Sequence, residues 1–86
     1  MIMEITRDNN DYYYYIVRIN IKKYRMLKNY TAQELADLSG FTHQFIRDLE
    51  CLKIIRRPRI DTLHIIADAL DIDIKQLFDE VDNILV

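Results

Sequence analysis

Four side chains of this 86-residue sequence are Ser, Cys or His, the types that supply many nucleophiles and general bases: Ser39, His43, Cys51 and His64. Nucleophilic catalysis needs a nucleophile with a general base in reach, and metal catalysis needs ligands at a defined spacing. The sequence offers neither a nucleophile–base pair nor a metal-ligand spacing among them. We therefore expect no enzyme activity, no metal site and no cofactor.

The chemistry that the sequence does favour is the binding of a polyanion. Between Arg18 and Arg59, ten Lys and Arg residues face four Asp and Glu residues, a net charge of +6. From Ile60 onward, one Lys faces seven acids, a net charge of −6. This segregation predicts a basic face for a polyanion, with the acidic end turned away from it. An ordinary solvated surface also accounts for the charges, so the motifs must decide.

Helices must position this basic face. Half of the residues are hydrophobic, and a single glycine and a single proline leave little material for turns that need a positive φ. The length allows one domain, of a size that is often stabilised by dimerisation. The lone Cys51 excludes a disulfide within the chain, and no apolar run approaches the roughly 18 residues that span a bilayer. We expect a cytoplasmic protein that contacts no membrane.

The first helix is predicted from a double stripe along residues 12–30. Apolar residues at positions 17, 21, 24 and 27 run beside cations at 18, 22, 25 and 28, which is helical spacing. Asp11 is placed to cap this helix. The tyrosines of residues 12–15 also favour strands, so a hairpin between Met3–Arg7 and Tyr12–Ile16 stays open.

Capping signals bound the next two helices. Thr31 and Glu34 form a capping box that starts a helix at Ala32, and Gly40 stands where a left-handed residue ends a helix. Thr42 caps another helix only two residues later. Two helices joined by so short a turn cross at a large angle, which is the helix-turn-helix arrangement.

Two more helices are predicted after Pro58. Apolar residues at 63, 66, 67 and 70 give the fourth helix one buried stripe. Asp73 is placed to cap a short fifth helix over residues 74–81.

This ordered set of residues resembles the Xre/Cro/lambda-repressor family of helix-turn-helix DNA-binding domains over about Val17–Asp79. The matching residues are Ile21, Arg25, Lys28, Thr31, Glu34, Leu35, Ala36, Gly40, Ile46, Leu49, Glu50, Pro58, Thr62, Leu63, Ile66, Ala67, Leu70, Leu77 and Phe78. The resemblance implies an all-α, five-helix lambda-repressor-like DNA-binding domain over residues 12–80. Residues 1–11 are then an N-terminal extension, and residues 81–86 a C-terminal tail.

The resemblance also implies the contacts with double-stranded DNA. The recognition helix would place five residues against base edges: Thr42, His43, Gln44, Arg47 and Asp48. Gln suits an adenine edge and Arg a guanine edge. We expect six residues to contact phosphates: Lys28, Gln33, Lys53, Arg56, Arg57 and Arg59. The implied function is a sequence-specific transcriptional regulator, a repressor, that binds an operator as a homodimer through residues 32–50.

One departure from the family pattern affects the end of the recognition helix. The family usually has a glycine soon after the glutamate matched by Glu50, and here Leu52 takes that place. This predicts a recognition helix that continues through Cys51 and Leu52. The dimer contact is expected from the tyrosines of residues 12–15 or from the tail VDNILV.

Two alternatives stay open. In the first, an antitoxin-like or antirepressor-like module uses the same scaffold to bind a protein partner, with Asp48, Ile54 and Ile55 at the contact. In the second, a MerR-like regulator carries a β-wing at residues 54–60. The salt dependence of DNA binding separates the first alternative from the DNA-binding hypothesis, because an affinity that rests on phosphate contacts falls steeply with added salt. A β-wing would support the second alternative.

Overall fold

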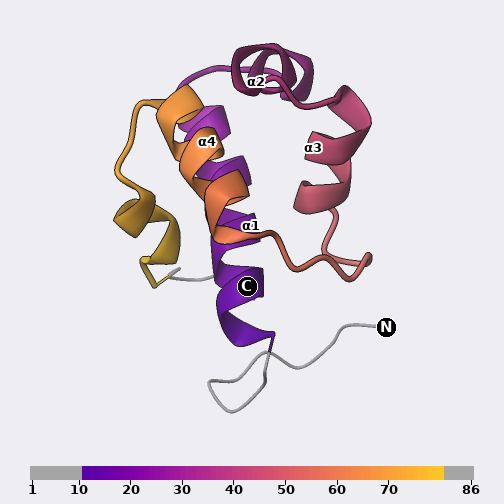
Figure 1. Cartoon of the computed structure of the whole chain (residues 1–86), viewed down its shortest axis with the longest axis vertical. Helices are drawn as coiled ribbons and strands as arrows, with labels where there is room; N and C mark the ends of the chain where they lie inside the picture. Colours follow the sequence, from indigo (N-terminus) through magenta and orange to yellow (C-terminus); the bar gives the residue numbers. More distant parts are fainter. Residues whose placement is uncertain (1–10, 81–86) are drawn as a thin grey trace.

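Helix α1 (Tyr12–Leu27) forms the centre of the fold in the computed structural model, which describes residues 11–80. It is followed by α2 (Ala32–Ser39), α3 (His43–Glu50), α4 (Ile60–Leu70) and the 3-10 helix η1 (Ile74–Phe78). In Figure 1, α4 packs across α1, α2 lies at the top, and α3 and η1 flank α1 on opposite sides. Residues 11–80 contain no strand, which confirms the all-α prediction.

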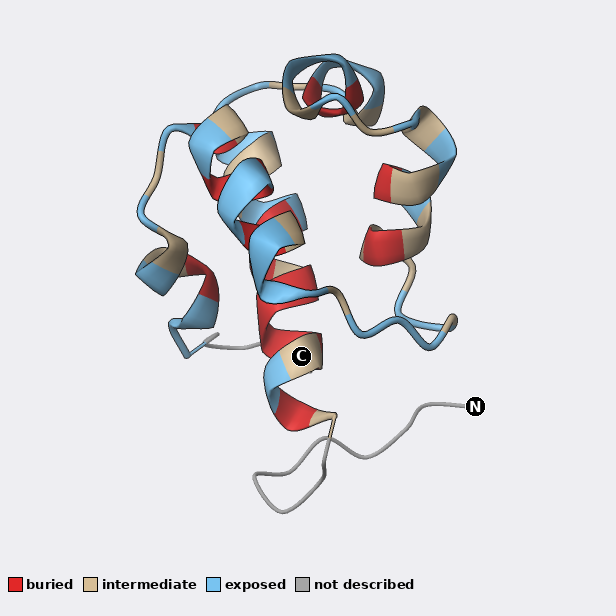
Figure 2. Cartoon of the chain, in the orientation of Figure 1, coloured by how far each residue is buried: buried red, intermediate tan, exposed pale blue. Residues whose placement is uncertain are grey.

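The core lies where these helices face one another. Its buried side chains are Val17, Ile21, Leu35, Ala36, Ile46, Leu49, Leu63, Ile66, Ala67, Leu70 and Leu77. Figure 2 shows the buried residues on the inward sides of the helices and the exposed residues on their outer sides. The apolar stripe predicted for the fourth helix is therefore the buried side of α4.

The predicted helix-turn-helix is present with its caps. Thr31 Oγ1 accepts from the Glu34 N–H at 3.0 Å, and Glu34 Oε1 accepts from the Thr31 N–H at 2.8 Å. Gly40 ends α2 in the left-handed region at φ 82°. Thr42 Oγ1 then accepts from the Phe45 N–H at 3.1 Å and caps α3.

Two other chain reversals use left-handed residues other than glycine. Asn29 lies just after α1 at φ 62°, and Asp71 ends α4 at φ 58°. Asn and Asp tolerate this region better than other residues with a Cβ atom. A chain with one glycine can thereby build three left-handed positions within residues 11–80.

The hairpin considered for the N-terminus is wrong for Tyr12–Ile16, which forms the start of α1. Tyr12, Tyr15 and Ile16 are buried, and their spacing fits one side of a helix rather than a strand. Packing thus outweighs the strand preference of the tyrosines. Met3–Arg7 lies outside the described residues. The Asp11 carboxylate makes no cap bond to α1 and accepts from Arg57 instead.

The fifth predicted helix is a shorter 3-10 helix, η1, rather than an α-helix over residues 74–81. The end of η1 is bound to α1, because the Asn20 side chain donates to Leu77 O at 2.8 Å and to the following Asp79 O at 2.9 Å. The Asp79 N–H closes the tight turn on Gln76 O. Leu77 is fully buried by this arrangement.

The third helix ends at Glu50, so the predicted continuation through Cys51 and Leu52 is wrong. Cys51 has an extended backbone, with φ −91° and ψ 100°. Its carbonyl accepts from the Arg18 side chain and from the Ile54 N–H, which closes a turn instead of a further helical turn.

Candidate nucleic-acid interface

Helix α3 presents two different sides. Ile46 and Leu49 are buried at 0% and 1% exposure and fix its inner side to the core. Ala36 of α2 is also fully buried, as expected of a small residue where two helices pack closely. The outer side of α3 carries the polar residues predicted to contact bases, and Gln44 and Arg47 on it are exposed.

The outer side holds a small hydrogen-bonded network. Gln44 Nε2 donates to Asp48 Oδ1 at 2.8 Å, and Arg56 Nη2 donates to Asp48 Oδ2 at 3.3 Å. The Asp48 carboxylate, predicted to contact a base, therefore already has two donors. Because a carboxylate only accepts, this bond turns the amide nitrogen of Gln44 toward Asp48.

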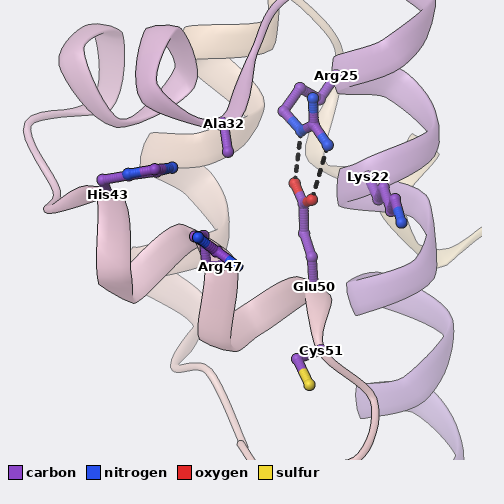
Figure 3. Close-up of a pocket in the computed structure, with 7 residues that line it drawn as sticks. All are labelled: Lys22, Arg25, Ala32, His43, Arg47, Glu50 and Cys51. Atoms are coloured by element: carbon purple, nitrogen blue, oxygen red, sulfur yellow. Dashed lines mark hydrogen bonds and ion pairs between the residues drawn. The ribbon is translucent and has the colours of Figure 1, made fainter.

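A hollow of about 420 Å³ lies beside α3, between α1 and the start of α2. Figure 3 shows its lining residues: Lys22, Arg25, Ala32, His43, Arg47, Glu50 and Cys51. His43 and Arg47, both predicted base contacts, thus share a cavity with a cation of the first helix, Lys22. Lys22 was absent from the predicted contacts, although its place in the cationic stripe of α1 was a usable signal.

An ion pair closes the inner wall of this hollow. Arg25 donates to both carboxylate oxygens of Glu50, from Nε at 2.7 Å and from Nη2 at 2.8 Å, as the dashed lines in Figure 3 show. Arg25 Nη1 also donates to Tyr30 O at 2.7 Å. The hydrogen bond to Glu50 raises the pKa of Arg25 above its ordinary value. This cation is therefore engaged inside the protein.

The comparisons with known proteins agree with this geometry. A family model described as Helix-turn-helix matches residues 21–77, more than half of the chain. The chain belongs to the Xre/lambda-repressor-like helix-turn-helix family. The matched residues run from α1 through both helices of the motif to η1.

The fold of this helix-turn-helix protein resembles that of a hypothetical transcription factor, NHTF, from Neisseria, with a TM-score of 0.72. The two chains are 18% identical, and the likeness covers 92% of this chain and 86% of the other. The search of curated proteins found no match. The family supports a role as a DNA-binding transcriptional regulator.

The six predicted phosphate contacts lie in three places on the helix-turn-helix domain. Lys28 follows α1, and Gln33 lies in the first turn of α2 with its amide bound to Asp37 Oδ1 at 2.9 Å. The link at residues 51–59, which joins α3 to α4, carries the other four: Lys53, Arg56, Arg57 and Arg59. All six are exposed.

Three of the link arginines are paired with acids. Arg56 pairs with Asp48, Arg57 with Asp11 at 2.8 Å, and Arg59 with Asp61 at 3.2 Å. The arginine side chains remain 44%, 55% and 82% exposed, so solvent screens these pairs and each contributes little to stability. The link contains no strand, and the winged, MerR-like alternative therefore lacks its wing.

Arg18 does not belong to the basic surface at all. It is 2% exposed, and its guanidinium donates to main-chain carbonyls at the end of the recognition helix. Burial lowers the pKa of Arg18, because desolvation disfavours its charged form. The missing family glycine at Leu52 was the signal that this helix end needed another donor.

Two further properties concern residues 11–80 as a whole. No helix in this range is both long and apolar enough to cross a bilayer. The same range brings no three His, Cys, Asp or Glu residues together in a way that could hold a metal ion.

Proposed function

We propose that the protein is a transcriptional repressor that binds an operator as a homodimer, with α3 in the major groove. The base contacts of the proposal are Thr42, His43, Gln44, Arg47 and Asp48. Its phosphate contacts are Lys28, Gln33, Lys53, Arg56, Arg57 and Arg59, to which the hollow beside α3 adds Lys22. This role requires neither a cofactor nor a metal, and places the protein in the cytoplasm.

One observation carries the proposal: cations from two helices line the same hollow beside α3. Lys22 from α1 and Arg47 from α3 line one hollow, and the start of α2 forms its upper wall. A helix start favours phosphate through its free N–H groups and its dipole. A DNA strand lying along this wall would bring its bases to Gln44 and Arg47.

The homodimer of the proposal is supported by the way such domains read DNA. Two recognition helices related by a two-fold axis must lie about 34 Å apart to enter successive turns of one groove. Tyr12 and Tyr15 are buried in the core, whereas Tyr13 is 51% exposed and available for a dimer contact. The alternative contact, VDNILV, lies outside the described residues.

Selection of bound fragments from genomic DNA tests the proposal. Affinity for the selected site is then measured by fluorescence anisotropy over a range of salt concentrations. With the six cationic phosphate contacts of the proposal, log K should fall with log salt at a slope of about −5 per subunit. Failure to bind any fragment at low salt would contradict the proposal.

Arg47→Ala and Lys75→Ala make a matched pair for the same assay. Both side chains are exposed, but Lys75 lies on η1, away from α3. Arg47→Ala should weaken the selected site by about tenfold or more, and Lys75→Ala should leave it unchanged. Analytical ultracentrifugation of the complex measures whether two copies bind each site.

A second candidate function, a module that binds a toxin or an antirepressor, has one observation in its favour. Ile55 and Ile60 are 57% and 66% exposed at the two ends of the basic part of the link. Exposed apolar side chains of this size are typical of protein contacts when they are clustered. Absence of DNA binding at low salt, with a protein partner that Ile55→Asp releases, would favour this candidate.

A further inference from the structure

The end of α3 is held by a buried side chain from α1. Arg18 Nε donates to Leu49 O at 2.8 Å, and Nη2 lies 2.7 Å from Cys51 O and 2.6 Å from Ile54 O. Longer contacts reach Asp48 O at 3.2 Å and Arg56 O at 3.5 Å. One guanidinium thus joins the last turn of α3 to the link that follows it.

Helix α3 needs such a donor because of how it ends. The last four carbonyls of any helix lack partners within the helix. Many helices end in a left-handed glycine, which turns the next backbone N–H groups back onto these carbonyls. In residues 11–80 the positive φ angles are at Asn29, Gly40 and Asp71, and thus outside α3 and the link. Leu52, two residues after the end of α3, supplies no left-handed cap.

A second contact ties the same link to α1. Arg57 donates to the Asp11 carboxylate from Nε at 2.8 Å and from Nη2 at 3.2 Å. Asp11 immediately precedes α1, and Arg18 lies two turns further along that helix. The link is therefore tied to α1 by the buried Arg18 and, more weakly, by the exposed pair of Arg57 with Asp11, and Val17 and Ile21 fix α1 in the core.

We propose that Arg18 is a positioning residue that replaces the glycine cap of the recognition helix and holds the link in its observed conformation. It sets where the end of α3, Lys53 and Arg56 lie relative to the rest of the domain. The effect on DNA binding rests on the proposed function, whereas the effect on the helix end does not.

Amide hydrogen exchange, followed by NMR, tests the position of the helix end directly. In Arg18→Met, which keeps the length of the side chain but removes its donors, the Cys51 and Ile54 amides should exchange about tenfold faster. The amides of Ile21 and Leu35 in the core should change much less. Lys23→Met, which also removes a charge from an exposed residue of α1, is the matched control and should change neither pair.

A rescue separates capping from general stabilisation. Leu52→Gly introduces a residue that can adopt the left-handed cap, and Leu52 is 37% exposed. Combined with Arg18→Met, it should reverse most of the faster exchange at Cys51 and Ile54. In the protein that retains Arg18, the same change should bring no slowing.

Three outcomes would overturn the proposal: unchanged exchange in Arg18→Met, an equal rise at core and helix-end amides, or no rescue by Leu52→Gly. Should Arg18→Met fail to fold, Arg18→Lys takes its place, since it keeps the charge but not the planar fork. Global unfolding of Arg18→Lys as well counts as an equal rise and against the proposal.

The effect of Arg18 on DNA binding is tested by measuring the affinity of the same variants for the selected DNA fragment. Arg18→Met should bind it about tenfold more weakly at a temperature where the core amides stay protected, and Leu52→Gly should restore part of the loss. Undiminished affinity in folded Arg18→Met contradicts the positioning of the DNA contacts. If the unaltered protein binds no DNA, the proposed function fails while the exchange measurements still decide the role of Arg18.

Discussion

The Arg25 guanidinium faces the Glu50 carboxylate through two hydrogen bonds of 2.7 and 2.8 Å, and so joins α1 to the last residue of the recognition helix. The two side chains are only 13% and 9% exposed. Removal of either partner leaves the other charge largely buried and unpaired. Such a loss is more costly than the loss of a pair in water.

Arg25→Met should therefore lower the free energy of unfolding by about 3 kcal/mol, as measured by urea denaturation. Arg59→Met is the control, because the pair of Arg59 with Asp61 is 82% and 65% exposed. The control should cost less than about 0.5 kcal/mol. Equal losses in the two variants would mean that burial does not strengthen the Arg25–Glu50 pair.

Gly40 should be sensitive to backbone conformation rather than to the size of a side chain. A Cβ atom at this position would meet no atom within 4 Å, whereas φ is 82°. Gly40→Ala should cost about 1 kcal/mol and Gly40→Val about 2 kcal/mol, since a β-branched residue tolerates this region least. Gly40→Asn should cost least, and urea denaturation of the three variants ranks them. A loss in Gly40→Asn as large as that in Gly40→Val would point to crowding instead.

Asp48 should control base preference through Gln44. Gln44→Ala should change the preferred base at one operator position. The binding free energy should there lose about 1 kcal/mol or more of its discrimination between the preferred base and the others. Asp48→Ala frees the amide of Gln44 to rotate, and should broaden the preference at that same position. Binding-site selection with each variant measures both effects. An unaltered preference in Asp48→Ala would show that the bond between these side chains does not orient Gln44 on DNA.

Arg57 should act on all DNA sequences alike. Arg57→Ala should reduce the slope of log K against log salt by about one per subunit, with no change in base preference. Asp11→Asn is the informative partner, because it removes the acid that competes with phosphate and should tighten binding to random DNA. A slope that Arg57→Ala leaves unchanged would restrict Arg57 to its pair with Asp11.

The helix-turn-helix was predictable because its signals are local. The capping box of Thr31 and Glu34, the left-handed Gly40 and the cap Thr42 each act within four residues, and the structure has all of them. The inner residues of α3 and α4 followed from helical spacing. These features depend on the sequence near each helix and need no knowledge of the tertiary fold.

Features that depend on distant contacts were missed. The spacing of α1 places Arg18 in the basic stripe, but its side chain binds carbonyls more than 30 positions away, where α3 ends earlier than its sequence suggests. Asn20 likewise binds the carbonyls of Leu77 and Asp79, where the structure has the 3-10 helix η1 and its end instead of the predicted fifth α-helix. Both are polar residues beside apolar ones in the stripe of α1. Neither spacing nor propensity shows which partner such a residue will find.

The bonds from Asn20 also bear on the order in which the chain folds during its synthesis. Their acceptors, Leu77 O and Asp79 O, belong to residues that follow Asn20 by 57 and 59 positions. Contacts at such separations form late, because a long loop must close before they can contribute. The turn between α2 and α3 closes within a few residues and can form early. On the ribosome, the side of α1 toward η1 therefore stays uncovered until residue 79 has been made, and in a nascent chain halted earlier the Asn20 amide would lack both of its acceptors.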